Sequence, residues 1–224
     1  AASRAYVPRS MWKRIKAELA DQVESITMGD VADFGNFMGA VINEEAFKKH
    51  RGAIAYAKRN STSSIVAGGL TDGREGWFVR PTVVETTDPS FRLMEEELFG
   101  PILTVYPYPD REWEKTLDIL DATSPYALTG AVFARDRDAV SMAEVRLVNA
   151  AGNFYINDKP TGAVVGQQPF GGARGSGTND KAGSHLNLLR WVSPRTVKET
   201  YVPPTDYRHP YMGLDQTPED PDRQ

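Results

Sequence analysis

The chain has 224 residues, a formal net charge of −4 at pH 7 and no cysteine. With 40% hydrophobic and 25% charged residues it has an ordinary globular composition, enough for one large domain with or without an appendage. The acidic balance argues against a nucleic-acid-binding face, and the missing thiols exclude disulfides, thiolate metal sites and thiol catalysis within this chain.

Neither a membrane span nor a secretion signal is recognisable. No apolar run approaches the about 20 residues that cross a bilayer. No basic-then-apolar segment opens the sequence. The first residue is Ala1 and not methionine, and residues 1–8 resemble the interior of a longer sequence. We therefore expect the sequence to have been processed or to be part of a longer reading frame.

Two amphipathic helices are predicted in the first quarter of the chain. Ser10 is a plausible N-cap for a helix over residues 10–25. Its apolar stripe repeats every fourth residue: Met11, Ile15, Leu19 and Val23. Asn43 can cap a second helix over residues 44–59. We expect His50 on the polar face of this helix, exposed to solvent.

Strands and helices alternate in the middle of the chain. Extended segments are predicted at residues 65–67, 77–79, 82–84, 102–106, 130–134 and 152–157. Asp110 opens one intervening helix, and Asp136 or Asp138 opens the next. Strands separated by such helices indicate βαβ units, so the predicted fold class is α/β with a parallel sheet.

The end of the chain differs in composition. Residues 161–183 are Gly-rich and polar, and a short helix or turn follows around residues 186–191. Residues 196–202 alternate polar and larger side chains, as an edge strand does. Residues 213–224 are rich in Pro, Asp and Gln with few apolar anchors, and we expect them to be disordered.

The segment Glu97-Leu98-Phe99-Gly100-Pro101 places a carboxylate and an aromatic ring beside a forced turn. On spacing alone, Glu95 to Glu97 are the solvated acidic end of a helix. The Glu97 carboxylate can also accept two hydrogen bonds from a ribose diol, and the Phe99 ring can pack on an aromatic ligand. Chemistry alone permits the second interpretation without favouring it.

The Gly-rich region offers one candidate binding loop. Consecutive backbone N–H groups around Gly162 suit an anion-binding nest, but from the residues alone a surface loop with turn-forming glycines is the preferred interpretation. Residues 171–177 match neither a dinucleotide fingerprint nor a P-loop, and Ser176 lies outside a nucleophile elbow, so we interpret this segment as structural. The three histidines show no metal-ligand spacing.

Several stretches together resemble the aldehyde dehydrogenase superfamily. They are Ala2–Pro8, Glu96–Pro101, Leu128–Phe133, Asn149–Lys159, Val165–Ala173 and Ser176–Lys181. The resemblance covers nearly the whole chain up to about Val202. Its last two stretches are typical of the branch that oxidises L-glutamate γ-semialdehyde, which is in equilibrium with Δ1-pyrroline-5-carboxylate, to L-glutamate in proline catabolism.

The resemblance implies covalent catalysis in which a cysteine attacks the aldehyde, hydride passes to NAD and a glutamate activates water to hydrolyse the thioester. In this family the cysteine lies two positions before the residue matched by Ala1. The general base, the oxyanion-hole asparagine and the dinucleotide-binding domain lie further upstream. We therefore expect a carboxyl-terminal part of such an enzyme, with no catalytic residue of its own. The alternatives are a truncated, non-catalytic binding or assembly module, and the dehydrogenase part of a bifunctional proline-oxidising enzyme.

The resemblance also implies roles for five residues. Glu97 matches the glutamate that binds the nicotinamide ribose of NAD, and Phe99 matches its aromatic neighbour. Gly162 and Ala163 match the loop whose backbone amides hold the α-carboxylate of the substrate. Phe170 matches an aromatic residue packed on the substrate's aliphatic chain.

Domain organisation and partners follow from the same resemblance. Residues 1–193 correspond to part of the catalytic domain, residues 194–212 to an oligomerisation arm, and residues 213–224 to a disordered tail. The expected partners are a small-molecule aldehyde and further copies of the chain, with no nucleic acid, membrane or metal. The expected location is the cytoplasm, or the mitochondrial matrix in a eukaryote.

Overall fold

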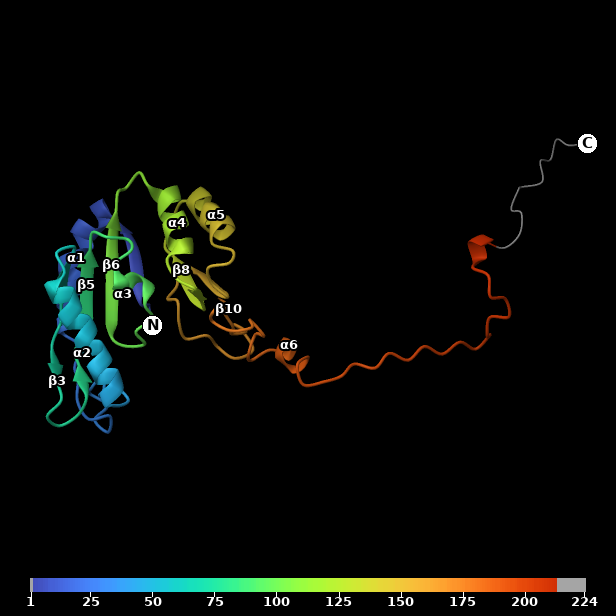
Figure 1. The fold of residues 1–224 in the computed structure, drawn as a ribbon, viewed down its shortest axis with the longest axis horizontal. Coiled ribbons are helices and arrows are strands. Elements are labelled where there is room, and N and C mark those ends of the chain that lie inside the picture. The colour runs from blue at the N-terminus through green and yellow to red at the C-terminus, as the bar shows by residue number, and fades with distance from the viewer. Residues whose placement is uncertain (1, 213–224) are drawn as a thin grey trace, which may run out of the picture. The chain divides into compact units, whose positions relative to one another are not determined.

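The computed structural model describes residues 2–212 and divides the chain into two units, Ala1–Leu188 and Leu189–Gln224 (Figure 1). The tail predicted to be disordered, residues 213–224, lies outside the described residues. Among the described residues, no helix has the length and apolar character needed to cross a membrane.

The first unit is built on a four-stranded sheet in the order β1-β6-β5-β2. β1 (Arg4–Pro8) and β5 (Thr82–Thr86) both run parallel to β6 (Ile102–Tyr108), whereas β2 (Ser63–Ala67) runs antiparallel to β5. The predicted α/β class is confirmed. β1 was not predicted, because its five residues show no alternation and it becomes a strand only by pairing with a segment far along the chain.

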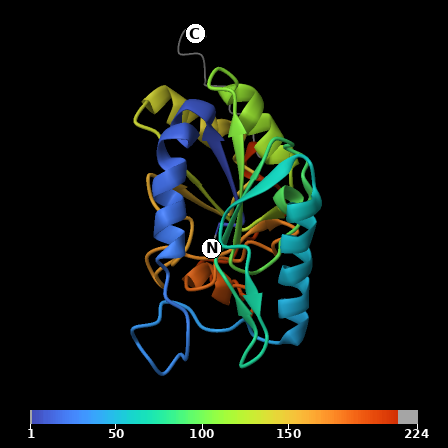
Figure 2. The same cartoon turned by 90° about the vertical axis from the view of Figure 1, so that its left-hand side faces the viewer.

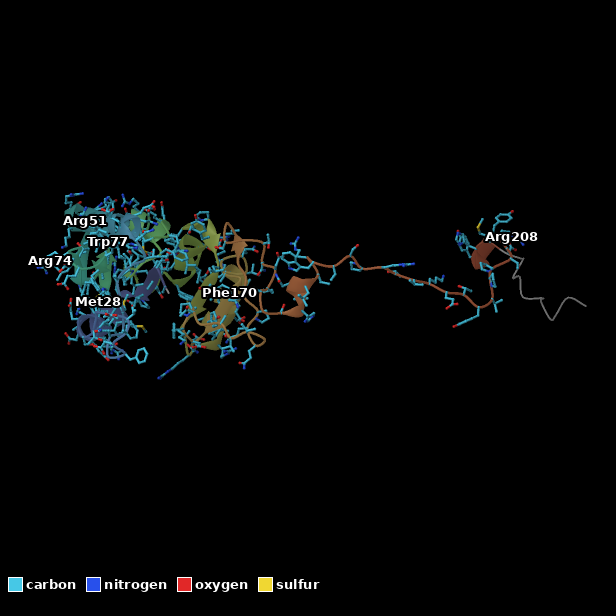
Figure 3. The ribbon with its side chains drawn as sticks, turned by 90° about the horizontal axis from the view of Figure 1, so that it is seen from below. Met28, Arg51, Arg74, Trp77, Phe170 and Arg208 are labelled. Atoms are coloured by element: carbon cyan, nitrogen blue, oxygen red, sulfur yellow. The ribbon has the colours of Figure 1, made fainter. Side chains whose placement is uncertain are left out.

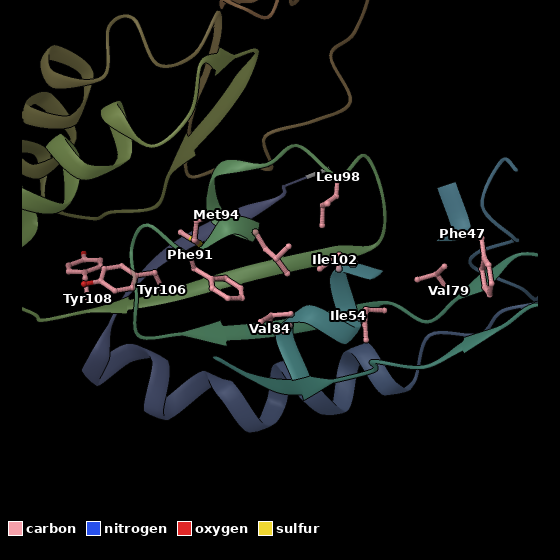
Figure 4. Close-up of a cluster of buried hydrophobic side chains, with 13 residues drawn as sticks. Phe47, Ile54, Val79, Val84, Phe91, Met94, Leu98, Ile102, Tyr106 and Tyr108 are labelled. Atoms are coloured by element: carbon pink, nitrogen blue, oxygen red, sulfur yellow. The ribbon is translucent and has the colours of Figure 1, made fainter. Parts of the chain in front are cut away.

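Helices cover both faces of this sheet (Figure 2). α1 (Arg9–Glu24) packs through Trp12 on the face that carries Val83 and Val105. α2 (Glu44–Arg59) packs on the opposite face, where α3 (Arg92–Glu95) also lies. The side chains between the sheet and α2 form the larger of the two hydrophobic clusters (Figure 4). Its buried members include Phe47, Ile54, Val84, Phe91, Met94, Leu98 and Ile102.

Both predicted helices are confirmed, with two corrections. The Asn43 side chain caps α2 by accepting a hydrogen bond from the Ala46 N–H at 2.8 Å, as predicted. Ser10 is not the N-cap of α1. The helix begins at Arg9 after Pro8, and the Ser10 N–H instead donates to the Asp110 carboxylate at 3.2 Å. His50 is only 1% exposed, so its predicted solvent exposure is wrong.

A second, two-stranded parallel sheet follows in the same unit. It consists of β8 (Thr129–Val132) and β9 (Asn153–Ile156), with α4 (Trp113–Ala122) and α5 (Arg137–Arg146) in the same hydrophobic cluster. The Asp136 side chain caps α5 by accepting from the Asp138 N–H at 2.9 Å, which confirms the first of the two predicted openings. Two further pairings and two short helices complete the described elements: β3 (Thr71–Asp72) with β4 (Phe78–Val79), β7 (Tyr126–Ala127) with β10 (Ala173–Arg174), α6 (His185–Leu188) and the 3-10 helix η1 (Pro210–Met212).

α4 does not begin at Asp110 as predicted; the helix starts at Trp113 with Glu112 at its N-cap position. The Asp110 carboxylate lies before the helix and binds Ser10 at the start of α1. In the described part of the second unit, residues 189–212, only η1 is regular. The expected strand at 196–202 is therefore not formed within a single copy. An edge strand can pair with a strand of another chain, so pairing of this segment with another copy stays a prediction.

Candidate functional site

The first unit contains a cavity of about 1750 Å³ between the start of β1, the turn at residues 97–101, β8 and the loop at residues 160–170. Binding pockets for single small molecules usually measure roughly 300–1,000 Å³, so this groove has room for more than one ligand. All five residues singled out in the sequence line it: Glu97, Phe99, Gly162, Ala163 and Phe170. The fold thus brings together two segments that lie far apart in the sequence, while the roles of the residues stay predictions.

The turn after α3 presents Glu97 and Phe99 to the groove. The Phe99 N–H donates to one Glu97 carboxylate oxygen at 3.1 Å, and the Lys49 ammonium donates to the Glu97 carbonyl at 2.9 Å. Phe99 adopts φ 58°, in the left-handed region that a non-glycine residue seldom occupies, and its side chain is 88% exposed. An exposed aromatic ring on a strained backbone is suited to contact a flat ligand.

The His50 side chain packs against this turn. Its buried ring lies so close to Gly100 that a Cβ there would stand 2.1 Å from the His50 Cε1 atom. Within the described residues, Nδ1 of His50 has no hydrogen-bond partner. Burial, together with the positive charge of Lys49, lowers the pKa of the imidazole, which favours the neutral ring. Gly100 is therefore required by close packing, because the turn that carries Glu97 rests on a buried ring.

Gly100→Ala is expected to destabilise the protein by about 1–3 kcal/mol, because the ring or the turn must move to admit the methyl group. Urea unfolding of the variant measures the loss. Gly52→Ala is the matched control, since a Cβ at Gly52 meets nothing within 4 Å and alanine favours the helix. Adding His50→Ala should recover part of the loss. Equal stability of the two single variants would contradict the packing argument.

The second segment, residues 160–170, presents two backbone amides. Gly162 adopts φ 76°, and neither its N–H nor that of Ala163 donates a hydrogen bond to any residue that the structure describes. A Cβ at Gly162 would lie 3.8 Å from the Lys159 Nζ, so an ammonium group lies beside the two amides. Consecutive free N–H groups near a positive charge favour binding of an anion such as a carboxylate.

Phe170 lies at the far end of this loop, in the part of the first unit that follows α4 (Figure 3). Its side chain is half-buried, and its backbone pairs with Ala182 through two hydrogen bonds of 2.9 Å and 2.7 Å. The ring lines the same cavity as the Gly162 and Ala163 amides. The two amides and Phe170 thus border the same space.

The remaining candidates do not form a site. No group of three or more His, Asp or Glu side chains within residues 2–212 is arranged to hold a metal ion. The Ser176 hydroxyl accepts a hydrogen bond from the Ala127 N–H at 2.8 Å and so joins two loops, in agreement with a structural role. Sequence reasoning missed Lys49, because its contact with Glu97 joins α2 to a turn that local spacing does not connect to it.

Comparison with known proteins adds family evidence to this geometry. Residues 1–197 match the sequence profile of the Aldehyde dehydrogenase family. The chain is 55% identical over 212 residues to the mitochondrial Delta-1-pyrroline-5-carboxylate dehydrogenase of Dictyostelium discoideum, covering 95% of this chain and 38% of that protein. It is 50% identical over 213 residues to the mitochondrial enzyme of that name from Homo sapiens, again covering 38% of its length.

Similar solved structures carry corresponding enzyme names. The chain superposes on a crystal structure of the Mycobacterium tuberculosis Delta-pyrroline-5-carboxylate dehydrogenase bound with NAD, with a TM-score of 0.82 and 53% identity, covering 96% of this chain and 39% of the other. A Thermus 1-pyrroline-5-carboxylate dehydrogenase with bound NAD gives a TM-score of 0.75 at 35% identity, covering 85% of this chain and 35% of the other. The chain thus spans less than two fifths of the length of these relatives.

Proposed function

Because this chain belongs to the aldehyde dehydrogenase family, we propose that it forms the carboxyl-terminal part of an NAD-dependent Δ1-pyrroline-5-carboxylate dehydrogenase. This enzyme would oxidise L-glutamate γ-semialdehyde to L-glutamate in proline catabolism. The observation that carries the proposal is one groove that joins the Glu97–Phe99 turn to the free amides of Gly162 and Ala163. Its cytoplasmic location, or mitochondrial location in a eukaryote, belongs to the same proposal.

The residues of the turn fit the nicotinamide half of NAD. One Glu97 carboxylate oxygen accepts the Phe99 N–H, and the other accepts no hydrogen bond from the residues described, so it is available to a ribose hydroxyl. The exposed Phe99 ring can cover the nicotinamide. NAD supplies the acceptor for the hydride removed from the substrate. Glu97 and Phe99 hold the ring in place for that transfer, which depends on a near-attack geometry.

The loop at residues 161–170 fits the substrate. The amides of Gly162 and Ala163, beside the Lys159 ammonium, would bind the α-carboxylate of the semialdehyde. Phe170 would cover its aliphatic carbons. The thiol nucleophile has to come from outside these 224 residues, since they contain no cysteine.

Substrate preference tests this function directly. The full-length protein that contains this chain is assayed with NAD and either L-glutamate γ-semialdehyde or propanal, which lacks the carboxylate. We expect kcat/KM for the semialdehyde to exceed that for propanal by about 100-fold or more, because a site built for a polar group rejects analogues without it. Equal values for the two aldehydes would contradict the proposed substrate.

Glu97→Gln in the full-length protein is expected to slow hydride transfer and weaken NAD binding. Loss of a charge-assisted hydrogen bond to the ribose costs about 1.5–3 kcal/mol. Steady-state kinetics with varied NAD measures the effect. Glu96→Gln is the control, because the Glu96 side chain forms an exposed ion pair with Arg92 at 3.3 Å and does not line the cavity. Unchanged kcat and KM for NAD in Glu97→Gln would make Glu97 a solvated helix-end charge.

We propose that residues 1–193 serve the catalytic domain and residues 194–212 an oligomerisation arm. Large apolar side chains in the described part of the second unit are exposed, among them Trp191, Val197, Tyr201 and Val202. Such exposed side chains, on a segment that forms no strand of its own in a single copy, favour association with another copy of the chain.

Removing everything after Ser193 from the full-length protein is therefore expected to give monomers or aggregates. The apolar surface that the arm would cover becomes exposed, and the strand that pairs the copies is lost. Light scattering coupled to size exclusion measures the mass of the species. If the shortened protein still forms a homogeneous oligomer of native size, the arm is not needed for assembly.

A further inference from the structure

Asn153, the first residue of β9, binds the backbone on both sides of Phe170. Its Nδ2 group donates to the Pro169 carbonyl at 3.0 Å, and its Oδ1 atom accepts from the Gly171 N–H at 3.1 Å. The Asn153 side-chain amide thus binds the residues directly before and after Phe170, whose side chain lines the groove. Because Phe170 itself pairs with Ala182 through two backbone hydrogen bonds, its main chain is held from both sides.

The other end of the loop has a separate anchor. The Thr129 hydroxyl on β8 donates to the Pro160 carbonyl at 2.8 Å, two residues before Gly162. β8 and β9 are paired, with Thr129 directly opposite Asn153. The anion-binding amides and the Phe170 ring are therefore fastened to neighbouring positions of one small sheet. The distance between amides and ring, which sets the length of ligand that fits, depends on these two anchors.

The chemistry of this contact requires a side chain that donates and accepts at once. Asparagine carries an NH₂ donor and a carbonyl acceptor at the same reach, whereas an ionised aspartate of the same shape only accepts. An aspartate in this place would point a carboxylate oxygen at the Pro169 carbonyl, and the two acceptors would repel each other. The segment around Phe170 would then shift away from β9.

We propose that Asn153 is a positioning residue for substrate selection, which fixes Phe170 at the distance from the Gly162 and Ala163 amides that suits a short α-carboxylate aldehyde. This inference rests on the proposed function. Asn153 acts through Phe170 and does not itself line the groove. Its loss therefore raises KM for the semialdehyde, while KM for NAD, which depends on the separate Glu97 turn, stays unchanged.

Asn153→Asp in the full-length protein tests the inference, with Asn157→Asp as the matched control. Asn157 follows the same strand and makes the same kind of contact with another segment, donating to the Ala134 carbonyl and accepting from the Ala134 N–H, both at 2.9 Å. Each substitution removes one donated hydrogen bond and keeps one accepted hydrogen bond. Kinetics with L-glutamate γ-semialdehyde, propanal and NAD, together with thermal melts, separate substrate selection from general damage.

We expect Asn153→Asp to lose about tenfold or more in kcat/KM for the semialdehyde, mainly through KM, with a much smaller loss for propanal. Asn157→Asp should leave the ratio between the two aldehydes unchanged. If Asn153→Asp fails to fold, Asn153→Ser, which is too short to span Phe170, should show the same selective rise in KM. A wild type that prefers the semialdehyde together with Asn153 variants that keep this preference would overturn the inference alone. A wild type without the preference would overturn the proposed function as well.

Discussion

The 224-residue chain alone is expected to form no NADH when it is mixed with NAD and L-glutamate γ-semialdehyde. The mechanism that the family resemblance implies needs a thiolate that attacks the aldehyde, and none of these residues is a cysteine. The proposed groove would bind ligands without supplying the group that reacts with them. NADH absorbance, compared with a buffer blank and with the full-length protein, measures the difference.

Turnover by the isolated chain well above the blank would contradict this account, because it would require a nucleophile other than cysteine. The reciprocal experiment supplies the rest of the enzyme as a separate polypeptide. Activity that appears only when both polypeptides are present would show that this chain contributes binding surfaces to a site completed elsewhere.

Gly162→Pro is expected to cause a loss of about 100-fold or more in kcat/KM for L-glutamate γ-semialdehyde in the full-length protein. Proline removes one of the two free N–H groups, and its ring fixes φ near −65°, whereas Gly162 adopts φ 76°. Both effects damage the binding of the α-carboxylate. The loss for propanal, which has no carboxylate to bind, should be much smaller.

Gly166→Pro is the control for damage to the loop itself. Gly166 has a similar φ of 81° and its N–H binds the Gly183 carbonyl, but it does not line the groove. Thermal melts of both variants exclude misfolding. Equal losses for the two aldehydes in Gly162→Pro, or equal selectivity in the two proline variants, would mean that the loop shapes the fold and does not bind the substrate.

Local signals in the sequence were sufficient for much of the fold. The apolar spacing and Asn43 located α2 to the residue, and Asp136 marked the start of α5. Features that depend on distant partners were missed. β1 exists only through its pairing with β6, and His50 is buried because the turn at Gly100 covers it. Neither partner is close in sequence, so the spacing of apolar residues cannot indicate these contacts.

Prediction of the candidate site had the same limit: the sequence showed local chemistry but not the contacts between distant segments. From chemistry alone, Glu97 was a solvated helix end and Gly162 a turn glycine, and the resemblance to a family supplied their predicted roles. The structure adds that both segments line one cavity and that the amides of Gly162 and Ala163 are free of partners among the described residues. The hydrogen bonds of Asn153 around Phe170 had no sequence signal, because an asparagine at the start of a strand usually marks only a turn.

A crystal structure of the full-length protein with NAD and the product L-glutamate would show whether the groove binds both ligands through the residues proposed. We expect the α-carboxylate of glutamate within hydrogen-bond distance of the Gly162 and Ala163 N–H groups, with its aliphatic carbons against Phe170. We also expect the nicotinamide ribose within hydrogen-bond distance of the Glu97 carboxylate. Glutamate bound elsewhere with these two amides unoccupied, or a ribose held without Glu97, would contradict the proposed site.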